Sequence, residues 1–162
     1  RNLSRYKSSR RGCCFMKKLE AIELKNLNLL KHYRIIRKWA SKNNDLREAD
    51  LELLIYLDCT DLFTKKDFEL GVYSYSWDNR RWSRLIKGDW IKVWRTRNRT
   101  TQKYNIYTVS FKGKQLINRI YRIMLKEEDL PTSSRRNSII KGNSYMDKVL
   151  TKAIYNVNKD NN

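Results

Sequence analysis

The sequence contains little of what makes tight turns, disulfides or metal sites. Its 162 residues include five glycines, one proline, three cysteines and one histidine. So few glycines and a single proline exclude a collagen-like or Gly/Ser-linker protein, and they argue against an all-β chain with many tight turns. No apolar run approaches the ~20 residues needed to cross a bilayer, so no integral membrane segment is expected.

The cysteines and the histidine form no pattern that carries chemistry. Cys13 and Cys14 are adjacent, and no Cys-x-x-Cys or Cys/His zinc spacing is present. Cys59 ends an apolar stretch and is predicted to be a small core residue, while His32 in a Lys/Arg-rich stretch is predicted to be structural. Without a phosphate loop, a nucleophile–histidine pair or a dense carboxylate cluster, the sequence predicts no enzyme, no catalytic residue, no metal and no cofactor.

Acidic residues are also scarce relative to basic ones. The chain has 36 Lys+Arg and 17 Asp+Glu, a formal net charge of +19. A field of this size attracts polyanions, which makes nucleic acid the first candidate partner and an anionic membrane surface the second. Hydrophobic residues make up 40% and aromatic residues 12%, enough for a folded domain with a core.

Residues 1–15 are treated separately because they carry five bases, no acid and no helical period. They lack the apolar segment of about 7–15 residues that a secretory signal requires. Two hypotheses fit them: untranslated upstream sequence read in frame before Met16, or a disordered basic arm that contacts nucleic-acid backbone. A cytoplasmic location is expected, associated with the nucleoid, or in the host cytoplasm for a virus-encoded protein.

Residues 16–126 are predicted to form one domain of helices followed by a β-hairpin. Apolar spacing and capping residues predict five helices: about Leu27 to Lys42, Asp45 to Cys59, Thr64 to Leu70, Ser74 or Ser76 to Lys87, and Ser110 to Lys126. Asp45 is the predicted N-cap of the second helix, with Glu48 as its capping-box partner, and Thr64 is the predicted N-cap of the third, with Asp67 three residues on. In the fourth of these, Trp82, Leu85 and Ile86 are expected to face inward. Alternating and β-branched residues predict two strands, beginning at Ile91 and covering 103–109, with a basic loop at 95–102.

Beyond this domain, residues 127–143 are predicted as a polar linker. Residues 144–162 are predicted as a last helix and tail, with an apolar stripe that makes the segment a possible dimerisation element. The complete order predicts a mainly α fold with a small β-hairpin wing, that is, a winged helix-turn-helix with flanking N- and C-terminal helices.

Charge is divided unevenly along the chain. Residues 45–70 hold eight acidic and three basic residues, net −5, whereas residues 71–125 hold thirteen basic and two acidic residues, net +11. A division of this kind favours one face that meets phosphates.

Two sets of side chains are therefore candidate DNA contacts. Arg, Asn and Ser match the hydrogen-bonding edges in a major groove, and Arg suits a narrow minor groove or the phosphates. The predicted recognition-helix set is Ser76, Asn79, Arg80, Ser83, Arg84 and Lys87, and the predicted wing set is Arg95, Arg97, Arg99 and Lys103. Trp77, Trp82, Trp90 and Trp94 cluster in the same region and are predicted mostly to fill the core or pack the hairpin, with base stacking on single strands as the alternative.

Four stretches within residues of about 45–126 share one pattern: LREADLELLIYL, FTKKDFE, SYSWDNRRWSRLIKGDWI and YTVSFKGKQLI. Together they resemble the winged helix-turn-helix domain of the MarR family of bacterial transcription regulators. The resemblance implies DNA binding and a homodimer joined through the first and last helices, here residues 27–42 and 144–158. Two positions depart from the family pattern: Asp89 follows Gly88 where the family has Gly before the first strand, and the wing tip is basic at 97–99.

The sequence thus predicts a double-stranded DNA-binding transcription regulator that is sequence-specific and homodimeric, with no membrane partner and with any small-molecule effector unidentified. The alternative is a protein that binds RNA or single strands, or that packages nucleic acid.

Overall fold

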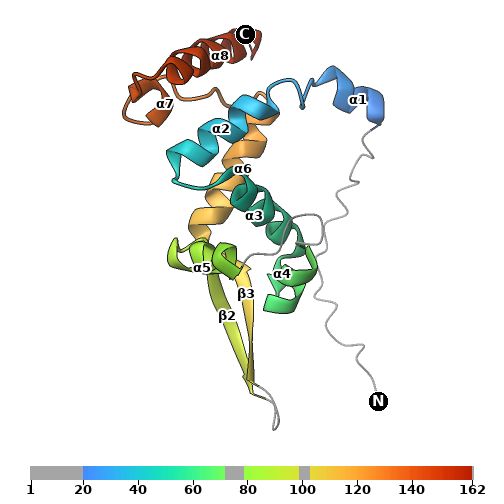
Figure 1. The fold of residues 1–162 in the computed structure, drawn as a ribbon. Helices are drawn as coiled ribbons and strands as arrows, with labels where there is room; N and C mark the ends of the chain where they lie inside the picture. The colour runs from blue at the N-terminus through green and yellow to red at the C-terminus, as the bar shows by residue number, and fades with distance from the viewer. Residues whose placement is uncertain (1–19, 72–78, 99–102, 162) are drawn as a thin grey trace.

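The computed structural model describes residues 20–71, 79–98 and 103–161 (Figure 1). The predictions for residues 1–15 and for Ser74, Ser76, Trp77 and Arg99 lie outside these residues. The elements are α1 (Ala21–Asn26), α2 (Tyr33–Asn43), α3 (Glu48–Thr60), β1 (Leu62–Phe63), α4 (Lys65–Gly71), α5 (Asn79–Lys87), β2 (Ile91–Asn98), β3 (Lys103–Val109), α6 (Phe111–Met124), α7 (Ser138–Lys141) and α8 (Tyr145–Asn161).

The described chain is mostly helical, with one antiparallel sheet in the order β1-β3-β2. This confirms the mainly α class with a hairpin; β1 is a third strand that was not predicted, because two residues carry no periodicity. In Figure 1 the β2–β3 hairpin projects from one end of the molecule, and α7 and α8 cover the other end. The core lies between α2, α3, α6 and the sheet, and its largest fully buried side chains include Trp39, Phe63 and Phe68.

Several helix ends follow from local capping, as predicted. Thr64 and Asp67 form a capping box at α4, since the Thr64 amide donates to the Asp67 carboxylate (2.8 Å) and the Asp67 amide lies 3.3 Å from the Thr64 hydroxyl. The Ser110 hydroxyl accepts from the Gly113 amide at the start of α6. Side-chain caps of this kind satisfy amides that have no partner inside the helix.

The prediction of a capping box at Asp45 is wrong. Asp45 has a φ of 53° and ends α2: the Leu46 amide donates to the Ser41 carbonyl at 2.9 Å, as in a Schellman motif. The N-cap of the next helix is therefore Arg47, two residues later than expected, and the helix begins at Glu48. Helix α2 also begins late, at Tyr33, because residues 27–32 form turns.

Three burial or loop predictions are also wrong. Cys59 is exposed because the buried face of α3 runs through Leu51, Leu54 and Leu57 instead. Ile86 is exposed, although Trp82 and Leu85 beside it are buried. The 127–143 stretch contains the short helix α7, whose Ile139 is fully buried, so this segment packs on the domain.

The turn between α5 and β2 contains two residues with special backbone or packing requirements, Gly88 and Asp89. Asp89 has a φ of 58°, in the left-handed region that favours glycine, so a glycine is the natural residue there. Gly88 is needed for a different reason. A Cβ at Gly88 would lie 2.6 Å from Cδ1 of Trp90, whose buried ring crosses the turn closely.

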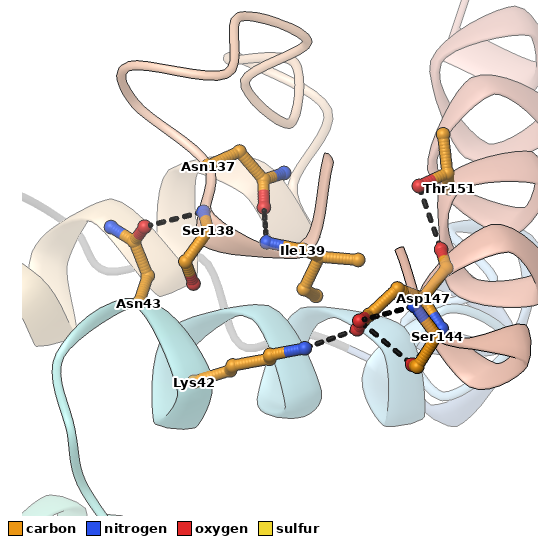
Figure 2. Close-up of polar contacts among 8 residues, drawn as sticks. All are labelled: Lys42, Asn43, Asn137, Ser138, Ile139, Ser144, Asp147 and Thr151. Carbon is orange, nitrogen blue, oxygen red and sulfur yellow. Dashed lines mark hydrogen bonds and ion pairs between the residues drawn. The ribbon is translucent and has the colours of Figure 1, made fainter. Parts of the chain in front are cut away.

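Helices α7 and α8 are attached to α2 by a polar network (Figure 2). The Lys42 ammonium pairs with the buried carboxylate of Asp147, and that carboxylate also accepts from the Ser144 hydroxyl at 2.7 Å. Nearby, the Asn43 side-chain oxygen accepts from the Ser138 amide at 3.1 Å. The bond from Lys42, followed by that from Ser144, holds the pKa of Asp147 below its usual range.

The far end of α8 is attached in a similar way. Lys31 pairs with Asp160 at 2.7 Å, and the His32 ring lies 3.3 Å from the same carboxylate. Burial is the largest cause that lowers the pKa of His32. His32 therefore packs at the junction of two terminal segments, which fits the structural role expected for it.

We predict that Asp147→Asn loosens the C-terminal helices. The carboxyl pKa is lowered in the folded protein, so its contribution to stability is present above the usual value near 3.8 and is lost as the pH falls through the lowered pKa. Hydrogen exchange at neutral pH should be several-fold faster in α8 of the variant, and its acid unfolding should be less steep. The exposed Glu127→Gln is the matched control; equal exchange in both variants would contradict the assignment.

Candidate nucleic-acid interface

Helix α5 has one buried side and one solvent-facing side. Trp82 and Leu85 are buried, and the positions about half a turn away from them face solvent. Among the predicted recognition residues, Asn79, Arg80, Ser83 and Lys87 are exposed. These four side chains thus lie together on one side of α5, whereas Arg84 does not, and Ser76 lies outside the described residues.

An aromatic cluster holds the buried side of α5. The Trp82 ring meets Phe68 of α4 and Tyr107 of β3 edge-on, each with ring centroids 4.8 Å apart, and Phe63 of β1 at 6.4 Å. Edge-to-face contacts add to the stabilisation from burial alone. Trp82 and Trp90 are packing residues, as predicted, whereas Trp94 is half exposed.

Arg84 makes an ion pair with a buried carboxylate. Its Nε and Nη2 donate to the two oxygens of Asp50 at 2.9 and 3.1 Å, and Asp50 is only 2% exposed. Arg81 Nε lies 3.9 Å from the same carboxylate. A bidentate pair of this kind fixes orientation as well as distance, so Arg84 positions α5 against α3.

Two further acidic residues of α3, Glu48 and Glu52, are also paired. Arg37 of α2 contacts Glu48 at 2.8 Å and Glu52 at 2.6 Å, and Lys38 also pairs with Glu48. The bond from Lys38 is the main cause that lowers the pKa of Glu48, and the bond to Glu52 raises the pKa of Arg37. Part of the acidic charge of residues 45–70 therefore joins α2 to α3 instead of covering a solvated face.

The hairpin carries the second set of predicted contacts. Strands β2 and β3 pair in register from Ile91 with Val109 to Asn98 with Lys103, with an irregularity that leaves Trp94 as the extra residue. The loop is thus shorter than predicted, and Arg95 and Arg97 lie within β2. Both are exposed, as is Lys103, and within the described residues no carboxylate pairs with either arginine.

Sequence reasoning missed a cleft of about 980 Å³ between α2 and α6. It is lined by Trp39, Lys112, Arg119 and Glu128, among others. The Arg119 guanidinium lies 5.3 Å from the Trp39 ring and pairs with Glu128 at 2.7 Å. No sequence motif marks this cleft, because its residues come from segments about 70 positions apart and meet only through packing.

Comparisons of the chain with protein-family models, with curated proteins and with solved structures each give no match. In the described residues, no group of three or more His, Cys, Asp or Glu is placed to hold a metal ion. Within the same part of the chain, no helix is long and apolar enough to cross a membrane.

We predict that Asp50→Ala destabilises the protein by about 3 kcal/mol or more, because removal of one partner leaves the Arg84 charge half-buried without its carboxylate. Urea denaturation measures the change in the free energy of unfolding. Glu69→Ala is the control, since it removes an exposed carboxylate from the neighbouring helix α4. Equal stability of the two variants would mean that the pair does not anchor α5.

Proposed function

We propose that this protein is a sequence-specific double-stranded DNA-binding regulator of transcription, of the winged helix-turn-helix type. One observation carries the proposal. Helix α5 presents Asn79, Arg80, Ser83 and Lys87 to solvent, while Trp82 and the Arg84–Asp50 pair hold its opposite and lateral sides against the body of the domain. A rigidly held helix with exposed base-reading side chains is the arrangement that a major groove accepts.

The order of the elements supports this proposal. Helix α3, strand β1, helices α4 and α5 and the β2–β3 hairpin follow one another as the parts of a winged helix-turn-helix do. The residues that resemble the MarR family cover the same elements. In this arrangement α5 is the recognition helix and the hairpin is the wing.

The chemistry of each exposed side chain defines its proposed role. Arg80 can donate two hydrogen bonds to the O6 and N7 atoms of guanine, and Asn79 can make the equivalent pair with adenine. Ser83 is able to bond either kind of edge. Lys87, at the end of the helix, is assigned to a phosphate, since its charge carries no base preference.

The proposed wing acts through charge. Arg95, Arg97 and Lys103 stand on a hairpin that projects from the domain, and their position suits phosphates or an A·T-rich minor groove (Figure 1). Arg99 belongs to the same proposed set and lies outside the described residues. The basic residues of the wing and of α5 together make a large electrostatic contribution to the binding free energy, and this contribution falls as the salt concentration rises.

The decisive variant is Arg80→Ala. On a preferred duplex selected from a random pool, it should cost about 1–3 kcal/mol and reduce discrimination at one base pair. Arg97→Ala should instead weaken all duplexes alike and reduce the salt slope by about one. Fluorescence anisotropy with matched duplexes measures both effects, and Arg135→Ala, an exposed arginine in the loop before α7, is the control.

Salt dependence supplies the accompanying check. If about eight phosphates are neutralised, the logarithm of the binding constant should fall with log[salt] at a slope of roughly −7. A slope near zero would overturn nucleic-acid binding as a whole. Unchanged affinity and base preference in Arg80→Ala would overturn the assignment of α5 alone.

We also propose an isologous homodimer that uses the exposed part of α8. The stripe predicted for this helix divides in two: Ile154 and Val157 are buried in the chain's own core, whereas Met146 and Val149 are exposed. The exposed part is available to a second copy, and a two-fold axis there would place two α5 helices on successive turns of DNA.

For this dimer we predict that Met146→Lys combined with Val149→Lys yields a folded monomer with weaker binding to a two-fold operator. The two lysines place like charges across the axis without entering the core. Sedimentation velocity at micromolar concentration measures the change, and circular dichroism checks the fold. A wild-type protein that sediments as a monomer would refute the dimer.

A further inference from the structure

The sheet has an inner face, which packs on the helices, and an outer face. Hydrogen bonds link Thr96 to Asn105 (2.9 Å) and Asn105 to the Tyr107 hydroxyl (3.4 Å), and Tyr107 packs on Trp82. These residues therefore lie on the inner face. Because strand side chains alternate, Ile106 and Thr108 lie on the outer face.

The base of this outer face contains a cleft of about 420 Å³. Its lining includes two aromatic rings that are poorly covered by the protein: Trp94 is 52% exposed and Phe111 is 70% exposed. Trp94 is the extra residue of β2, where the register shifts between Val93 and Arg95, so the irregularity sets its position on an edge strand. Exposed aromatic side chains gathered in one concave place indicate a binding surface.

The same cleft is basic. Lys92 and Lys114 line it together with the rings, and its one carboxylate, Asp61, is held by Lys114 at 3.2 Å. On the outer face the strand continues from Lys92 to Arg95, which is exposed and lies opposite Ile106. The cleft thus combines two aromatic surfaces with Lys92 and Lys114, and Arg95 lies beyond it on the same strand.

We propose that this cleft binds an unpaired nucleotide of single-stranded nucleic acid, with the base stacked on Trp94 or Phe111 and the adjoining phosphates on Lys92 and Lys114. Stacking on an aromatic ring is tolerant of sequence because every base has a π-face, and a cationic groove follows the backbone. The proposal rests on the proposed function only in taking nucleic acid as the partner. It uses a surface distinct from the exposed side of α5.

Charge decides between this occupant and the other possible ones. A second copy of the chain seated on the cleft through the same face would bring its own Lys92 and Arg95 toward those already there, and like charges oppose such a contact. A polyanion with planar bases satisfies the cations and the rings at once. An acidic protein would pair with the cations but has no bases to stack on the rings. Binding of oligothymidylate therefore distinguishes the two kinds of partner.

The probe is fluorescein-labelled oligothymidylate of about ten nucleotides, within the usual range of single-strand site sizes. Trp94→Ala and Phe111→Ala in the full chain should each weaken its binding roughly 5- to 100-fold, as expected for the loss of one stacked base. Trp94→Phe should restore most of the affinity. Tyr56→Ala, which removes a 48% exposed aromatic from α3, should leave the affinity unchanged.

Duplex binding measured on the same variants separates the two proposals. Trp94→Ala should leave the affinity for the preferred duplex within about twofold, while Arg80→Ala should lower it and leave oligothymidylate binding unchanged. Three outcomes would each overturn the proposal for the cleft. The first is unaltered oligothymidylate binding in Trp94→Ala and Phe111→Ala, and the second is an equal loss of affinity for duplex and single strand. The third is a self-association of the wild-type protein that Trp94→Ala abolishes. Oligothymidylate binding without duplex binding would overturn the proposed function and leave the cleft standing.

Discussion

The placement of α5 depends on one buried carboxylate, Asp50 on α3. A carboxylate at 2% exposure is costly to desolvate unless it is paired and hydrogen-bonded, and here Arg84 supplies two donors in a fixed geometry. The pair sets the rotation of α5 about its axis, so that Arg80 is exposed. The helix ends at Lys87, and the turn at Gly88 then leads Trp90 into the core and directs the hairpin away from it.

Charge has two different uses in this chain. Within the domain, opposite charges join elements: Arg37 bridges to α3, and Lys42 holds Asp147 at the start of α8. On α5 and on β2 the charged side chains at exposed positions are all basic. The basic side chains of α5 and β2 therefore lie on surfaces suited to polyanions.

Attachment of α7 and α8 to α2 makes the C-terminal segment part of the domain. Ile139 and Ile154 are fully buried, and the Asp147 carboxylate lies close enough to Gly142 that a Cβ there would collide with it. A polar stretch with few apolar residues still packs when side chains make hydrogen bonds to its buried backbone groups. The Asn137 side chain does this, because it accepts from the Ile139 amide and donates to the Pro131 carbonyl. Any dimer interface on α8 is thus confined to the part of the helix that this packing leaves exposed.

The sequence by itself determined the features that depend on neighbours within about four residues: the cap at Ser110, the capping box at Thr64, and the strand at 103–109. It also predicted the exposed basic side of α5, because the helical period and two buried positions define which side faces solvent. Only the tertiary structure decided that Arg84 faces Asp50, that Cys59 is exposed and that Trp94 stands at an irregular position in β2. Each of these depends on a partner tens of residues away or on a register shift between strands, and spacing along one segment carries no information about either.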